Sequence, residues 1–143
     1  MKFMILVPGN KDTEAGVMPT EAELTDMMKF NEELVKAGVM LAGEGLHPTS
    51  KGARLTFSGS GKPAVKDGPF TESKELIAGF WIIQVKSKEE AIAWMSRAPF
   101  PAGTVLDIRQ VFDTEDFAGS DPTGKIREQE NRLRTEAAKQ QQS

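Results

Sequence analysis

The sequence predicts a single α+β domain in which two helices cover one face of a mainly antiparallel sheet. Three observations lead to this fold class. Short apolar or alternating runs, typical of strands, recur along residues 1–112. Two segments between them carry apolar residues at helical spacing behind a capping signal. The length of 143 residues suits one domain, because two independent units would each be too small to bury a good core.

Both helices are expected where a hydroxyl residue precedes a glutamate by three positions. Thr20 and Glu23 have this spacing of a capping box, in which each side chain satisfies the backbone N–H of the other residue. An apolar stripe follows them, so we expect the first helix over residues 20–37. Ser87 and Glu90 repeat the spacing and start the second helix.

The strands are expected in six short segments. These are residues 3–7, 39–46, 53–58, 64–67, 79–86 and 104–112. The first and fifth are apolar on both faces, which is typical of central strands. In the third, Leu55 and Phe57 alternate with polar residues, so we expect one buried face, and residues 59–63 form a turn that makes a hairpin with the fourth. Residues 10–18 are expected to be a loop.

This order of elements indicates a ferredoxin-like sandwich, which we place at residues 1–118. Two helices can cover only one face of the sheet. An apolar face without a cover is normally buried against a second copy related by two-fold symmetry, so the sequence predicts a homodimer.

Residues 119–143 differ from the domain in composition and are expected to form a charged C-terminal extension. They contain many charges and few large apolar side chains. Glu128 with Arg132 and Glu130 with Arg134 have the favourable orientation of helical ion pairs. We therefore expect a solvated helix here.

Composition excludes several classes of function. The chain has no cysteine and one histidine, so disulfides, thiolate catalysis and the usual metal clusters are not expected, and we predict neither a metal nor a cofactor. A net charge of -3 provides no basic field for nucleic acid. The apolar run at residues 3–7 is too short for a signal peptide or a membrane span. We expect a cytoplasmic protein without nucleic acid or membrane partners.

One motif resembles a known family. Asp67-Gly68-Pro69-Phe70, followed by acidic and lysine positions and by Gly79-Phe80-Trp81, is similar to the DGPF group of the YCII-related family. The similarity extends over roughly residues 1–112 and includes Gly45-Leu46-His47-Pro48. The resemblance implies a dimeric α/β barrel of ferredoxin-like subunits. It also implies a His and Asp acid-base site, in which Asp67 corresponds to the aspartate of the motif.

The candidate catalytic residues are His47 and Asp67, and each also has a purely structural interpretation. An aspartate before Gly-Pro can hold a tight turn. At a strand end, beside the ring of Phe70, it can also act as a general base or orient an imidazole. His47 has the only side chain with an unperturbed pKa near neutrality, yet a loop histidine can simply end a strand. A distance within about 3.2 Å between the two side chains, or one bridging water, would support catalysis.

The candidate ligand-binding residues are Arg54, Phe70, Glu72, Lys74 and Arg109. Glu72 and Lys74 can form a charged rim or an ordinary exposed turn. The guanidinium groups of Arg54 and Arg109 can bind a carboxylate or phosphate, whereas Asp107 can instead pair with Arg109 in a salt bridge.

Three functions are therefore open. The first is a small-molecule-binding dimer in which His47 and Asp67 perform acid-base chemistry, as in an enzyme, on a polar metabolite. The second is a binding module that holds an anion through Arg54 or Arg109. The third is an interaction or regulatory protein that uses the motif and the C-terminal extension. A pocket with converging polar side chains favours the first two, and a flat surface favours the third.

Overall fold

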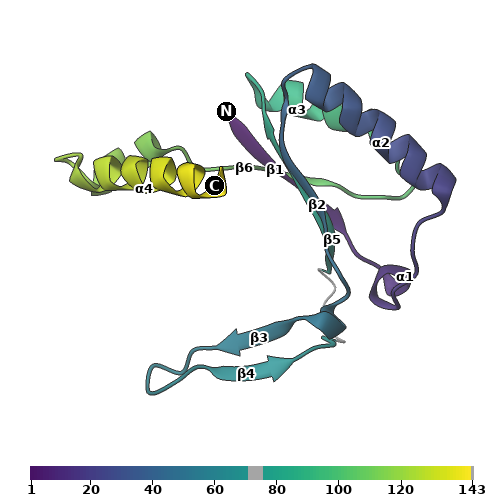
Figure 1. Cartoon of the computed structure of the whole chain (residues 1–143), viewed down its shortest axis with the longest axis horizontal. Coiled ribbons are helices and arrows are strands. Elements are labelled where there is room, and N and C mark those ends of the chain that lie inside the picture. Colours follow the sequence, from purple (N-terminus) through teal and green to yellow (C-terminus); the bar gives the residue numbers. More distant parts are fainter. Residues whose placement is uncertain (71–75, 143) are drawn as a thin grey trace.

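The computed structural model of the chain describes residues 1–70 and 76–142, and its centre is a four-stranded antiparallel sheet (Figure 1). The strand order is β2-β5-β1-β6, while β3 and β4 pair only with one another. The strands are β1 (Lys2–Pro8), β2 (Met40–Gly45), β3 (Ala53–Thr56), β4 (Ala64–Asp67), β5 (Ile77–Gln84) and β6 (Asp107–Gln110). The helices are α1 (Lys11–Glu14), α2 (Glu21–Lys36), α3 (Lys88–Met95) and α4 (Lys125–Gln141), with 3-10 turns η1 (Thr49–Lys51) and η2 (Thr114–Ser120).

Helices α2 and α3 lie on one face of this sheet, which confirms the predicted fold class (Figure 1). Alternate side chains of β1 and β5 point towards them and are buried. The largest fully buried side chains at this interface are Phe3, Ile5, Leu34 and Ile83. Trp81 lies among them with its ring edge-on to Phe30 and Phe100. It is a core residue, as aromatic residues in a central strand usually are.

The capping residues of the two main helices are those that the sequence predicts, but only half of each capping box forms. The hydroxyl oxygens of Thr20 and Ser87 accept the backbone N–H of Glu23 and Glu90 at 3.2 and 3.1 Å. Glu23 instead accepts the Thr20 hydroxyl, and Glu90 accepts the N–H of the residue before Ser87. Helix α2 ends as expected, because Gly38 adopts a φ of 71°.

The opposite face of the sheet has no helix against it within the described residues. Met4 and Ile82 are register partners on this face, and so are Leu6 and Phe80. All four side chains are half-buried in the isolated chain. The apolar uncovered face that the sequence predicts is therefore present.

The hairpin is the main departure from the sequence-based expectation. Strands β3 and β4 form it as predicted, but both are exposed along their whole length. The expectation of one buried face was wrong, because the hairpin extends away from the main sheet and no described helix or strand packs on it (Figure 1). The alternation of apolar and polar residues in its sequence corresponds to an apolar face that a single chain leaves exposed to solvent.

Two smaller expectations also fail. Residues 10–18 contain the short helix α1 because Asn10 and Thr13 form a reciprocal cap, with backbone-to-side-chain distances of 2.8 and 2.9 Å. The last strand covers only Asp107–Gln110, since its register with β1 is limited to the four residues Phe3 to Leu6.

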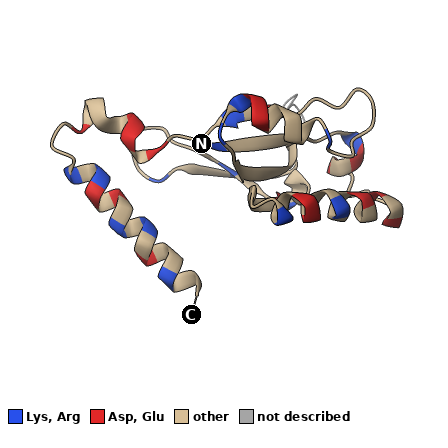
Figure 2. Ribbon diagram, turned by 90° about the horizontal axis from the view of Figure 1, so that it is seen from above, with Lys and Arg blue, Asp and Glu red and all other residues tan. Residues whose placement is uncertain are grey.

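The C-terminal extension forms helix α4, with no buried side chain, as predicted for a solvated helix (Figure 2). The pair Glu130 and Arg134 forms at 2.8 Å, whereas the structure records no pair between Glu128 and Arg132 in the described part of the chain. Helix α4 is joined to η2 by the buried Asp121, whose carboxylate accepts the backbone N–H of the third helical residue, Arg127, at 2.9 Å. This hydrogen bond holds the pKa of Asp121 below its usual range. None of the described helices combines the length and hydropathy needed to cross a bilayer.

Candidate functional site

The DGPF turn (residues 67–70) connects the hairpin to the main sheet. Strand β4 ends at Asp67, which faces Ala53 across the hairpin. The N–H of Gly68 donates to the carbonyl of Gly52 at 3.0 Å, so one more hydrogen bond continues the hairpin. A Cβ atom at Gly68 would lie 1.7 Å from the carbonyl oxygen of Thr49. Only glycine allows the turn to approach η1 this closely.

Three hydrogen bonds fix the DGPF turn against the first part of the chain. The carboxylate of Glu14 accepts the backbone N–H of Thr49 at 3.1 Å and its hydroxyl at 2.6 Å. The same hydroxyl oxygen accepts the backbone N–H of Phe70 at 3.0 Å. The three groups are partly buried, so the carboxylate acts as a shielded acceptor that connects α1, η1 and the turn.

Sequence reasoning did not identify Glu14 or Thr49. Glu14 lies 35 residues from Thr49, and Thr49 lies 21 residues from Phe70. Contacts between residues so far apart in the sequence produce neither a periodic pattern nor a short motif that sequence analysis could detect. The nearest indication in the sequence was the position of Thr49 just after the His47-Pro48 segment that the family resemblance includes.

Two of the predicted ligand-binding residues, Arg54 and Phe70, lie together. The guanidinium carbon of Arg54 is 4.2 Å from the centre of the Phe70 ring, which is cation–π geometry. Arg54 is on β3, so this contact connects the hairpin to the DGPF turn. The guanidinium has no ion-pair partner in the described part of the chain, and its N–H groups can therefore bind an anion.

His47 and Asp67 are both exposed. Each lies within two residues of the backbone contact between Thr49 and Gly68. His47 directly follows Leu46, whose N–H donates to the carbonyl of Ala78 at 2.8 Å. Thr49, two residues later, contacts Gly68, which directly follows Asp67. The described residues include no hydrogen bond or ion pair between the His47 and Asp67 side chains. The fold thus brings their backbone segments together without joining the two side chains in the isolated chain.

The other predicted residues fall elsewhere. Arg109 is exposed on β6, opposite Met4, in the main sheet and not in the hairpin that carries Arg54. Its neighbour Asp107 makes no ion pair with it in the structure as described. Glu72 and Lys74 lie outside the described residues.

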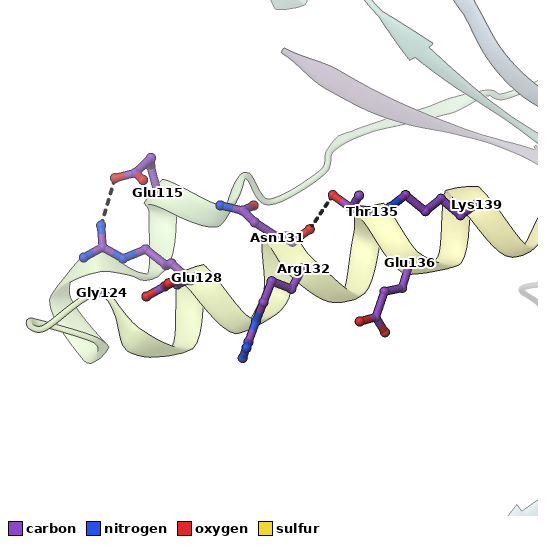
Figure 3. Close-up of a pocket in the computed structure, with 9 residues that line it drawn as sticks. Glu115, Gly124, Glu128, Asn131, Arg132, Thr135, Glu136 and Lys139 are labelled. Carbon is purple, nitrogen blue, oxygen red and sulfur yellow. Dashed lines mark hydrogen bonds and ion pairs between the residues drawn. The ribbon is translucent and has the colours of Figure 1, made fainter.

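Two surface hollows of the described chain lie away from this site. The larger, of about 660 Å³, lies between η2 and α4 and is open to solvent (Figure 3). Side chains of both charge signs line it, including Glu115, Arg127 and Glu136. The smaller, of about 320 Å³, follows α2. Neither hollow is lined by His47 or Asp67.

Comparisons with known proteins give a family and two similarities. An uncharacterized protein of Rhizobium meliloti (strain 1021) is 36% identical over 72 residues, which cover 50% of this chain and 57% of that protein. The solved structure of the 5-chloro-2-hydroxyhydroquinone dehydrochlorinase of Burkholderia phenoliruptrix AC1100, in complex with 2,5-dihydroxybenzoquinone, is 16% identical. That similarity has a TM-score of 0.38 and covers 80% of this chain and 98% of the dehydrochlorinase. The family described as the YCII-related domain matches residues 1–115, and the chain belongs to this family.

Proposed function

We propose that this YCII-related protein binds a small polar molecule beside the DGPF turn, and that His47 and Asp67 perform acid-base chemistry on it. The observation that carries the proposal is the hydrogen-bonded connection from Glu14 through Thr49 to Phe70. Partly buried polar contacts hold this turn in one geometry. Such fixed positions are what a binding site needs, because groups already in place lose less entropy when a ligand binds.

The residues around the turn have complementary chemistry for a polar ligand. The Arg54 guanidinium lies against the Phe70 ring, and its N–H groups can bind a carboxylate or phosphate in a bidentate manner. The imidazole of His47 can donate or accept a proton, and the carboxylate of Asp67 can accept a proton or stabilise an imidazolium. A ligand beside the turn would lie between the exposed side chains of His47 and Asp67. It would connect these two residues, whose side chains form no hydrogen bond with one another in the described structure.

A non-catalytic function is the alternative, and the Arg54 geometry favours it specifically. A guanidinium stacked on an aromatic ring is sufficient to hold an anion without any proton transfer. In this case His47 and Asp67 would act independently of one another. A titration of His47 separates the two functions.

The acid-base proposal predicts that Asp67→Asn lowers the pKa of His47, the only histidine of the chain. A nearby carboxylate stabilises the protonated ring, so removal of its charge should shift the titration to lower pH. The pKa is measured from the imidazole NMR signals between pH 5 and 8, the interval in which histidine ordinarily titrates.

Asp107→Asn is the matched control, because it removes a carboxylate that is also exposed but lies on β6 in the main sheet. It should leave the His47 titration unchanged. Identical titrations in the wild-type protein and Asp67→Asn would exclude communication between the two residues. The non-catalytic function would then be the better description.

We further propose that the chain is a homodimer in which a second copy covers the open sheet face. The half-buried side chains of Met4, Leu6, Phe80 and Ile82 form its apolar centre. Asp107 and Arg109 of the edge strand β6 border it on one side, as at the rim of an interface.

Sedimentation should therefore give about 31 kDa at micromolar concentration, twice the chain mass of 15.6 kDa. Ile82→Lys should shift the equilibrium towards the monomer, because it places a charge at the centre of the interface. Ile92→Lys is the control, since Ile92 is exposed on α3 on the other side of the sheet. A wild-type monomer would contradict the proposal.

A further inference from the structure

One face of the hairpin of β3 and β4 carries two basic side chains and no acidic one. Arg54 and Lys66 are register partners, so their side chains project from the same face of the hairpin, with Cβ atoms about 5 Å apart. Asp67 is the only acidic residue among residues 51–67, but it pairs with Ala53 and therefore lies on the other face. Like charges directly opposite one another repel, and no residue of the hairpin neutralises this pair.

The rest of the described chain does not neutralise the two cations either. The ion pairs recorded among the described residues join other side chains, and none of them includes Arg54 or Lys66. Both side chains are exposed. Two cations on neighbouring strands are therefore available to an anion from solution.

Phe70 fixes the position of one of these cations. The guanidinium carbon of Arg54 lies 4.2 Å from the centre of the Phe70 ring. The ring is held in turn, because the backbone N–H of Phe70 donates to the hydroxyl oxygen of Thr49 at 3.0 Å. The guanidinium donates no hydrogen bond to any described residue, so its N–H groups remain donors for a ligand. A donor group that is already in place lowers the entropic cost of binding.

The positions next to the basic pair on the same face carry small residues. Along the strands, Thr56 pairs with Ala64 on one side of it. On the other side, the N–H of Gly68 donates to the carbonyl of Gly52 at 3.0 Å. Beyond Gly68 the face ends at η1, because a Cβ atom there would lie 1.7 Å from the carbonyl oxygen of Thr49. A small anion can therefore approach both cations, with η1 bordering its position on one side.

A doubly charged anion matches this pair better than a singly charged one. The guanidinium of Arg54 can donate two N–H groups to two oxygens of one carboxylate or phosphate. A carboxylate then has no further oxygen, whereas a phosphomonoester keeps a third oxygen and carries close to two negative charges near pH 7. The ammonium of Lys66, on its flexible four-carbon stem, can reach this oxygen. The second cation thus favours a phosphate group over a carboxylate.

We propose that Arg54 and Lys66 bind the phosphate group of a small phosphomonoester on this face of the hairpin. The inference deepens the proposed function and rests on its binding of a polar molecule beside the DGPF turn. It names the anionic group of that molecule and adds Lys66 to the residues that hold it. It does not depend on the proton transfer proposed for His47 and Asp67, so the two proposals are tested separately.

Titration of isotope-labelled protein with phenyl phosphate, followed by the backbone amide NMR signals, tests the binding. Benzoate presents a similar ring with a single negative charge. Phenyl phosphate should bind about fivefold more tightly than benzoate, the ratio that corresponds to one additional exposed ion pair. The signals of Arg54 and Lys66 should shift during the titration. Inorganic phosphate should displace phenyl phosphate, because the two share the group that is recognised.

Three variants assign the two cations their separate contributions. Lys66→Gln removes the second charge and should weaken phenyl phosphate binding about fivefold while leaving benzoate binding almost unchanged. Arg54→Gln should weaken the binding of both ligands, because both use the guanidinium. Lys62→Gln is the matched control, since it removes an exposed lysine from the loop between β3 and β4 and should change neither affinity. All three side chains are exposed, so the variants should keep the wild-type unfolding midpoint.

Several results would contradict the phosphate site. Equal affinities of the wild-type protein for phenyl phosphate and benzoate would overturn it. Equal losses in Lys66→Gln and Lys62→Gln would do the same, because they would indicate attraction by the overall charge of the hairpin. Binding of phenyl phosphate that inorganic phosphate cannot displace would show that the protein recognises the ring instead.

The titration of His47 described above separates this inference from the acid-base proposal. A His47 pKa that falls in Asp67→Asn, without binding of either phosphate compound, would overturn the phosphate site alone. Selective binding of phenyl phosphate with identical His47 titrations would support the phosphate site and overturn the acid-base proposal alone.

Discussion

Gly68→Ala is expected to displace the DGPF turn and to destabilise the protein by about 1–3 kcal/mol, the usual cost of forcing extra atoms into a packed position. The added methyl group would lie 1.7 Å from the carbonyl oxygen of Thr49, so the two backbone segments must separate. Their separation would break the contact of Thr49 with Phe70 that positions the candidate site. Thermal unfolding followed by circular dichroism measures the loss, at about 4 °C for each kcal/mol.

Gly45→Ala is the matched control for this substitution. Like Gly68, Gly45 has no positive φ, but it lies in β2 and a Cβ atom there would meet nothing within 4 Å. The control should leave the midpoint unchanged or raise it, because alanine restricts the unfolded chain more than glycine does. Equal midpoints for the two variants would show that the turn does not pack on η1 in solution.

Trp81→Ala is expected to cost about 3–5 kcal/mol, the largest stability loss that we predict for a single side chain. The side chain is 5% exposed and its ring contacts Phe30 and Phe100 edge-on. Its Nε1 also donates to Asn31 Oδ1 at 2.9 Å. The truncation leaves a cavity between the sheet and α2 and removes the partner of Asn31. Denaturant unfolding measures the change in free energy.

Two variants make this measurement specific. Trp94→Ala removes a half-buried ring from α3 and should cost less, since more of that ring is already in contact with water. Trp81→Phe keeps most of the apolar volume but removes the hydrogen bond to Asn31, and should have an intermediate effect. Similar losses for Trp81→Ala and Trp94→Ala would contradict the central position of Trp81.

The sequence was sufficient for the parts of the fold that depend on local physics. Short continuous apolar runs predicted β1 and β5, because the central strands of a sheet are commonly apolar on both faces. Thr20 and Ser87 predicted the starts of α2 and α3, because a capping hydroxyl acts on an amide only three residues away. The same reasoning predicted helix α4, which rests on short-range pairs such as Glu130 with Arg134.

The reasoning failed where the outcome depends on what packs against an element. The alternating pattern around Leu55 correctly predicted a strand, although this strand ends at Thr56, before Phe57. Its predicted buried face is exposed, because no other helix or strand among the described residues covers it. Periodicity reports which residues share a face. It does not report whether that face is covered, nor by which copy of the chain.

The candidate site also combines features that local sequence predicts with features that depend on packing. By itself the sequence determined the motif, its strand-end position and the chemistry of His47, Asp67 and Arg54. Only the tertiary structure decided that Glu14 and Thr49 hold the turn, and that Arg54 lies on Phe70. The physical reason is that hydrogen bonds and ring contacts depend on distances of a few ångströms between atoms far apart in the chain. Local sequence patterns determine the elements, and the packing of those elements sets these distances.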